Sequence, residues 1–430
     1  MTVMLRPRTD LDRSDLRRGR IAVSTMFVLC GAVIGVWTAR IPAIKHDLQL
    51  SNAELSIALL ALAAGGLIGM LLVGRLVDRH GSTTVMTPMA LAVGPLLILP
   101  AYAPNLMTLT LALAVLGAAH GTLNVAMNAN AVRVERAYQR SIMSSVHAQF
   151  SIGGFLGAAV GGIFAAAGLS PAATFICAGI SIAALATWAS RRALPDPAAK
   201  PDHTATKDDR LRRRPVLSTS SPHSKKLFLL GLLAFATLVA EGAAADWSTV
   251  YLHDNLGSSA GVVAAAYAAF AAMMTAGRLA GDRLVAAFGP AQLVRGCSLL
   301  AAAGFGAGLL IGHPTAAIIG FAALGAGLSC IVPQAYSAAG NVDPAQPGRG
   351  LARVVSMGYL GFLTGPVIIG GAASLTDLPR ALLILPLLAA FVAAAAAAVR
   401  KPGPDSDSGT NTDDETTTVP APVNAHGYEG

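Results

Sequence analysis

Charged side chains are scarce in this chain of 430 residues: Asp, Glu, Lys and Arg make up 13% of it, against 54% hydrophobic residues. An ordinary soluble domain has about 25% charged residues, and a soluble chain of this length would cover its domains with charge. The composition therefore argues against a soluble globular protein. Instead, uncharged runs recur that are long enough to cross a hydrocarbon layer of ~30 Å as helices.

Cysteine is also scarce, and its placement argues against disulfide and metal sites. The four cysteines lie inside or at the edge of apolar runs and show no paired spacing: Cys30, Cys177, Cys297 and Cys330. We interpret them as small core residues. The sequence also lacks a metal-ligand cluster, a Walker loop and a nucleophile motif. It therefore predicts no cofactor and no enzyme.

The uncharged runs predict a polytopic helical membrane protein. Backbone groups cannot stay unpaired in lipid, so the runs must be helices, and the alternation typical of a barrel is absent. Twelve segments are expected, at residues 21–41, 54–74, 83–102, 105–131, 142–168, 171–190, 227–252, 258–279, 292–312, 314–338, 352–374 and 379–399.

The net charge of +8 is explained by topology and anionic headgroups, so no nucleic-acid partner is expected. Lys and Arg alternate between rich and poor loops through all twelve segments, and positive charge marks the cytoplasmic side. Both termini are thus predicted in the cytoplasm, with the chain in a plasma or bacterial inner membrane. The predicted parts are a basic N-terminus (1–20), a six-helix bundle (21–190), a linker (191–226), a second bundle (227–400) and a disordered tail (401–430).

The two halves resemble each other at a period near 205 to 210 residues. Residues 74–79, Gly-Arg-Leu-Val-Asp-Arg, follow the second segment, and residues 277–283, Gly-Arg-Leu-Ala-Gly-Asp-Arg, follow the eighth. Trp37 is echoed by Trp247. Parallel six-helix repeats are a transporter plan in which the substrate binds between the halves near the midplane.

These residues resemble the major facilitator superfamily over about residues 21–400, through the Gly-x-Leu-x-Asp-Arg-x-Gly loop and its degenerate second copy. The stretches 121–136, 144–153 and 241–247 are similar to the YbjJ-like branch, related to the fucose permeases. The resemblance implies that the loop latches the outward-open state. The alternative is a plain positively charged turn. The gating set at this loop and its copy is Gly74, Arg75, Asp78, Arg79, Gly81, Asp282 and Arg283, and Arg40 near the outer end of the first segment is a further gating residue.

In the residues themselves, Asp78 can accept hydrogen bonds from backbone N–H groups at a neighbouring helix end, or pair with an arginine. Two acids of the seventh segment, Glu241 and Asp246, are the deepest in the spans. Burial favours the neutral form of a carboxyl group, so either acid can bind and release a proton. The alternative is a structural acid. Arg40 is predicted to pair with Asp246 across a closed outer mouth, or to reach the headgroups.

Polar side chains share faces of two helices. His120, Asn124 and Asn128 are spaced by four in the fourth segment, and His147 lies in the fifth. We interpret them as a lining that hydrogen-bonds hydroxyl groups, or as links between helices. Gln334 and Tyr336 are further candidates. Trp37 and Trp247 are expected to stack on a sugar, to plug the outer gate, or to lie in the interface belt.

The chain departs from the fucose permeases, in which acids of the first and fourth helices carry the proton and contact the sugar. Thr38 and Asn124 stand at the matching places, and neither releases a proton at ordinary pH. Proton coupling would therefore rest on Glu241 first; the alternative is transport that is not coupled to protons. The sequence predicts a monomeric secondary transporter of a small polar, sugar-like solute. The alternatives are an exporter of amphipathic compounds and a membrane sensor or scaffold without flux.

Overall fold

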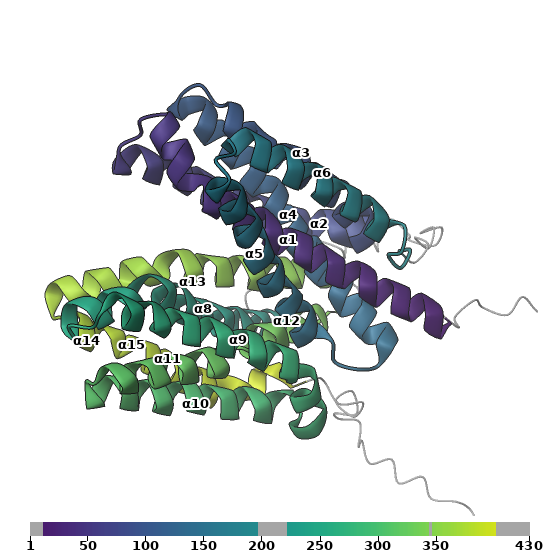
Figure 1. Cartoon of the computed structure of the whole chain (residues 1–430). Helices are drawn as coiled ribbons and strands as arrows, with labels where there is room; N and C mark the ends of the chain where they lie inside the picture. Colours follow the sequence, from purple (N-terminus) through teal and green to yellow (C-terminus); the bar gives the residue numbers. More distant parts are fainter. Residues whose placement is uncertain (1–11, 197–221, 344–345, 401–430) are drawn as a thin grey trace, which may run out of the picture. The chain divides into compact units, whose positions relative to one another are not determined.

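The computed structural model describes residues 12–196, 222–343 and 346–400, which form helices and contain no strand. The first half of the described chain (Figure 1) consists of α1 (Arg13–Asp47), α2 (Asn52–His80), α3 (Ser82–Ile98) with η1 (Leu99–Tyr102), α4 (Leu106–Tyr138), α5 (Met143–Ala166) and α6 (Pro171–Ser190). The all-helical fold predicted from the sequence is confirmed.

The second half continues from Pro222. Its elements are α8 (Pro222–Val250) with η2 (Tyr251–Asn255), α9 (Ala260–Phe288), α10 (Pro290–Ile311), α11 (Pro314–Leu328), α12 (Ile331–Gly340), α13 (Pro347–Leu375), α14 (Leu378–Leu382), α15 (Ile384–Ala395) and η3 (Ala396–Val399). Most of the predicted linker, at 197–221, lies outside the described residues, as do the tail at 401–430 and residues 1–11.

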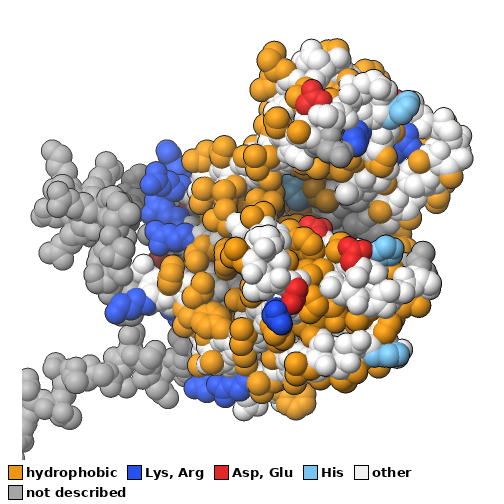
Figure 2. Space-filling view, turned by 90° about the vertical axis from the view of Figure 1, so that its left-hand side faces the viewer, with side chains coloured by type: hydrophobic (Ala, Val, Ile, Leu, Met, Phe, Trp, Pro, Cys, Tyr) orange, Lys and Arg blue, Asp and Glu red, His pale blue; other side chains and the backbone are white. Residues whose placement is uncertain are grey.

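Eleven helical segments of the described residues are long and apolar enough to cross a membrane. The eighth predicted segment corresponds to α9, which at 29 residues is also long enough. Figure 2 shows the matching surface: hydrophobic side chains cover most of the face drawn, and Lys and Arg gather toward one edge. The chain is a multi-pass membrane protein.

Several helices extend past the predicted spans. The stretch 74–79 lies in the last turns of α2, where a loop was expected, and α2 ends at His80. The helix ends there because Gly81 adopts φ +91°, a conformation that favours glycine. Helices can project from a bilayer because their polar ends remain hydrated. Hydropathy alone therefore does not predict the residue at which a helix ends.

The two predicted spans at 314–338 and 379–399 are each present as one apolar segment, Pro314–Gly340 and Leu378–Val399, but the helix is interrupted within each. The first is divided into α11 and α12 at Ser329 and Cys330, and the second into α14 and α15 at Leu383. Each break precedes a proline, Pro333 or Pro386. A proline has no N–H for the carbonyl four residues earlier, and its ring clashes with that carbonyl.

The same helix pairs pack in both halves. In the first half α1 contacts α5, α2 contacts α4, and α3 contacts α6; in the second half α8 contacts α13, α9 contacts α11, and α10 contacts α15. Glycines permit the close crossings, with Gly153 against the backbone at Val28 and Gly361 against the backbone at Phe235. The described residues belong to one compact unit that ends at Arg400, and the division into two separate bundles stays a prediction.

Candidate functional site

Asp78 joins the two halves at one end of the helices. Its carboxylate accepts hydrogen bonds from the backbone N–H groups of Gly348 (2.7 Å) and Arg349 (3.2 Å), at the start of α13. The Arg349 Nε atom lies 3.8 Å from the same carboxylate. A helix N-terminus carries unpaired N–H groups and partial positive charge, so an acid there is stabilised.

Asp282 makes the equivalent contact from the second half. It accepts hydrogen bonds from the backbone N–H groups of Ser144 (3.0 Å) and Ser145 (3.2 Å), at the start of α5. Asp78 of the first half thus caps α13 of the second half, and Asp282 of the second half caps α5 of the first half. We call the end of the helices that carries Asp78 and Asp282 the motif end.

Two further residues of α4 contact the second half at the motif end. Glu135, which is buried, accepts from the Ser337 hydroxyl and from the backbone N–H groups of Ile142 and Met143. Arg136 donates to the Asn341 side chain at 2.7 Å and to the Gly340 carbonyl oxygen. Neither residue was predicted as a functional residue, although both charged side chains lie in the last turn of α4.

The other residues of the predicted gating set at the motif end lie in the C-terminal parts of α2 and α9 or directly after α2. Gly74 is buried, and a side chain there would meet Arg349 and Ala352 of α13. Arg75, Arg79 and Arg283 are exposed. The latch assigned to this set stays a prediction.

Glu241 lies in α8 and pairs with an arginine that was expected in a loop. The Arg278 Nη2 atom of α9 lies 3.3 Å from Glu241 Oε2, and Arg278 Nη1 donates to the Ser151 hydroxyl of α5 at 2.7 Å. The arginine is 7% exposed. It precedes the end of α9 by ten residues, or about 15 Å along the helix.

Arg278 is the main functional candidate that the sequence reasoning missed. The predicted segment ended at residue 279, and the positively charged connection at 278–295 was expected to be a loop. No proline follows Arg278 before Pro290, and α9 continues through Gly281 to Phe288. The absence of a proline over those residues was the signal that the helix continues, and α9 ends where Gly289 adopts φ +75°.

The polar residues of α4 and α5 meet beside this ion pair. The Asn128 side chain donates to the Asn124 carbonyl oxygen at 2.8 Å, and His147 Nε2 lies 3.1 Å from Asn128 Oδ1. The His147 ring contacts the Tyr336 ring of α12, with 5.6 Å between centroids. Gln334, also of α12, donates to the Ser144 hydroxyl at 3.4 Å.

These contacts follow one face of α5, because Ser144, His147 and Ser151 are spaced by three and four residues. Each of the three contacts a residue of the second half. The structure therefore brings together six of the predicted residues: Glu241, Asn124, Asn128, His147, Gln334 and Tyr336.

His120 is separate from this group. Its Nε2 atom lies 3.1 Å from both the sulfur and the carbonyl oxygen of Cys30 in α1. The contact links α1 and α4 of the first half. Links between helices were one of the two alternatives stated for the polar residues of α4.

The two tryptophans pack within their own halves. Trp37 is 2% exposed and contacts the Phe175 ring, with 6.1 Å between centroids. Trp247 donates from Nε1 to the Pro366 carbonyl oxygen at 3.1 Å. In this conformation Trp37 is too buried to stack on a solute.

Arg40 is buried and donates to the Leu169 carbonyl oxygen, in the connection between α5 and α6. Asp246 is exposed on α8. The pair that they were predicted to form across a closed outer mouth stays a prediction. Figure 2 shows a face that is hollowed near its centre, with acidic and histidine side chains close to the hollow.

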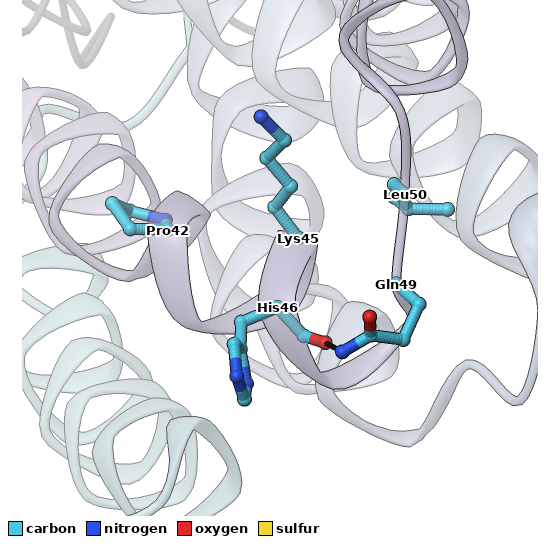
Figure 3. A pocket seen from close by; sticks show the side chains of 5 residues that line it. All are labelled: Pro42, Lys45, His46, Gln49 and Leu50. Atoms are coloured by element: carbon cyan, nitrogen blue, oxygen red, sulfur yellow. Dashed lines mark hydrogen bonds between the residues drawn. The ribbon is translucent and has the colours of Figure 1, made fainter.

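A separate cavity of about 330 Å³ lies where α1 turns into α2. Its lining, drawn in Figure 3, is formed by Pro42, Lys45, His46, Gln49 and Leu50. The Gln49 side chain donates to the His46 carbonyl oxygen at 2.7 Å, which closes the turn. The cavity includes none of the predicted site residues.

Within the described residues, no group of three or more His, Cys, Asp or Glu side chains is placed to hold a metal ion. The four cysteines are free. Cys30 and Cys330 are buried as expected of core residues, whereas Cys177 is exposed.

Comparison with known proteins gives one consistent result. The sequence matches the Major Facilitator Superfamily over residues 22–339 and 249–425. An uncharacterized MFS-type transporter of Yersinia pestis is 34% identical over 390 residues, covering 87% of this chain and 94% of the relative.

Two solved structures share the fold at 16% identity. One is an MFS transporter, FucP, in the outward conformation, with a TM-score of 0.72 over 89% of this chain and 99% of that one. The other is a variant of the E. coli fucose:proton symporter, FucP, with a TM-score of 0.70 over 91% of this chain and 100% of that one.

Proposed function

Because the chain belongs to the major facilitator superfamily, we propose that it is a proton-coupled secondary transporter of a small polar solute. The family and the fold are those of a transporter rather than of an enzyme. The observation that supports proton coupling is the Glu241–Arg278 pair, a carboxylate and a guanidinium in contact within two long apolar helices.

Alternating access is supported by where the two halves touch. Over the described ranges, the hydrogen bonds between residues before 191 and residues after 221 involve the motif end or the α5 face that extends from it. Opening of the motif end requires that these bonds break. A rocking movement about a central site is the general plan of transporters built from repeats.

Glu241 is proposed as the proton carrier. When it is ionised it holds Arg278, and Arg278 in turn holds Ser151 across the halves. Protonation of Glu241 removes the attraction to Arg278 and loosens that contact between the halves. In this way uptake of a proton is linked to the conformation.

The solute is proposed to bind at the cluster of Asn124, Asn128, His147 and Tyr336. Amide, imidazole and phenol groups provide both donors and acceptors, which suits hydroxyl groups. The membrane is proposed to be a bacterial inner membrane, with both termini in the cytoplasm and the protein a monomer.

Two substitutions test the solute site. His147→Ala is expected to abolish saturable solute uptake by proteoliposomes, because His147 links α4 to α12. His120→Ala is the matched control, since His120 contacts Cys30 within the first half. Equal loss of uptake in both variants would contradict a site at His147.

A further inference from the structure

We propose that the solute is a monoanion that carries a carboxylate, and that Arg278 binds that carboxylate. This inference rests on the proposed proton-coupled function and names its substrate class. The geometry that points to it is an unfilled donor on a buried arginine.

Two of the three guanidinium nitrogens of Arg278 have partners. Nη1 donates to Ser151 and Nη2 to Glu241, whereas the buried Nε atom has no hydrogen-bond partner. A buried donor without a partner is costly, and such groups in native structures call for an explanation. A carboxylate binds a guanidinium through two parallel hydrogen bonds, one of which the Nε–H can supply.

Charge balance gives the second argument. With Glu241 ionised, the empty site is neutral because Arg278 carries one positive charge. If a proton and a neutral solute entered, Glu241 would become neutral and Arg278 would be left as an unpaired buried cation, which is strongly unfavourable. If a proton and a monoanion entered, the site would remain neutral.

The monoanion thus replaces Glu241 as the partner of Arg278. A dianion such as a phosphate monoester would leave one negative charge uncompensated by this single arginine. Besides Arg278, the titratable groups beside Glu241 are Tyr267 of α9 and Tyr336 of α12, and His147 of α5 and Cys330 lie beside Arg278. Asp246 of α8 is exposed and interacts with Tyr267. Of this whole set, Arg278 alone is permanently positive.

Binding by the purified full-length protein in detergent tests the proposal. The probes are matched pairs that share a carbon skeleton: lactate with propane-1,2-diol, gluconate with sorbitol, and glucuronate with glucose. We expect at least one carboxylate to raise the melting temperature more than its neutral partner does. We also expect a larger rise at acidic pH than at alkaline pH, because protonation of Glu241 frees Arg278.

Variants identify the group that binds. Arg278→Gln leaves Glu241 without its partner and is at risk of misfolding, so the double variant Glu241→Gln with Arg278→Gln is measured beside it. Both are expected to lose carboxylate affinity by about 100-fold, the usual size for loss of one partner of a buried charged pair. Glu241→Gln alone is expected to bind the carboxylate equally at both pH values.

Arg40→Gln is the matched control. Arg40 is also buried, and its Nε atom also lacks a hydrogen-bond partner, but it contacts Leu169. This variant is expected to keep carboxylate binding. The proposal is overturned if no carboxylate stabilises the wild type more than its neutral partner, or if the double variant binds the carboxylate as well as wild type does.

Flux measurements separate this inference from the proposed function. Proton-coupled uptake of a neutral sugar by proteoliposomes would keep the proposed function and overturn the monoanion. Carboxylate binding that depends on Arg278, without any flux, would keep the site and overturn proton-coupled transport.

Discussion

At the scale of single residues, four acids at helix ends set the contacts of the motif end. Asp78 and Asp282 each cap a helix of the opposite half, while Glu135 and Asp196 cap helices of the first half. The sequence left two partners open for Asp78, backbone N–H groups at a neighbouring helix end or an arginine. The structure shows both at the start of α13, the N–H groups of Gly348 and Arg349 and the Arg349 side chain.

Removing the charge of Asp78 should favour opening of the motif end. Asp78→Asn weakens a charge-assisted contact between halves by about 1–2 kcal/mol, or about tenfold in population. The measurement is the distance distribution between spin labels placed on α2 and α13. Asp196→Asn is the control, because Asp196 accepts from Thr83 and Thr84 within the first half. Identical distributions in wild type and Asp78→Asn would contradict a latch.

At the scale of elements, glycines decide how closely the helices cross. Gly153 of α5 lies against the backbone of α1 at Val28, and a side chain at that position has no free space. Gly162, also in α5, has nothing within 4 Å of the position its side chain would take. The two positions have the same residue type in the same helix and differ in their surroundings.

This difference predicts opposite results for one substitution. Gly153→Ala is expected to destabilise the protein by about 1–3 kcal/mol, the usual cost of overpacking. Gly162→Ala is expected to be neutral or slightly stabilising, because alanine favours helix. Thermal unfolding in detergent checks both. A lower melting temperature for Gly162→Ala than for Gly153→Ala would show that the α1–α5 crossing is not limiting.

The elements also show what the sequence can predict. Apolar runs located the spans, whereas the repeated Gly-Arg-Leu, expected after the second and eighth spans, lies inside α2 and α9. The same pattern failed at Arg278, because a positive residue near a predicted span end was assigned to a loop. The pairing of Arg278 with Glu241 depends on the packing of α8 against α9, which a single sequence does not encode locally. Pro333 and Pro386 follow the two breaks, but Pro88 and Pro366 lie inside continuous helices, so a proline in the sequence does not by itself locate a break.

At the scale of the whole molecule, both ends of the chain are proposed to lie on the cytoplasmic side. That prediction rests on the alternation of Lys- and Arg-rich loops with poor ones, because positively charged loops mark the cytoplasmic side. Fusions of a green fluorescent protein and of alkaline phosphatase after Gly430 test it. The fluorescent fusion should be bright and the phosphatase inactive, with the reverse for fusions after Gly168. An active phosphatase at Gly430 would reverse the orientation.

Electroneutrality is the whole-molecule consequence of a proton that travels with a monoanion. Uptake should respond to a pH gradient and be unaffected by a membrane potential imposed with potassium and valinomycin. By contrast, a neutral solute with one proton would respond to ~100 mV with about 50-fold accumulation. A strong dependence on potential would therefore exclude the monoanion.

The central claim is that Glu241 carries a proton coupled to solute movement. Proton uptake by proteoliposomes tests it most directly, with carboxylates, sugars, polyols and nucleosides added one at a time to wild type and to Glu241→Gln. We expect one solute to make the outside medium more alkaline with wild type, and the proton signal to vanish with Glu241→Gln. Solute uptake without a proton signal, unchanged in Glu241→Gln, would show that Glu241 is only a structural partner of Arg278.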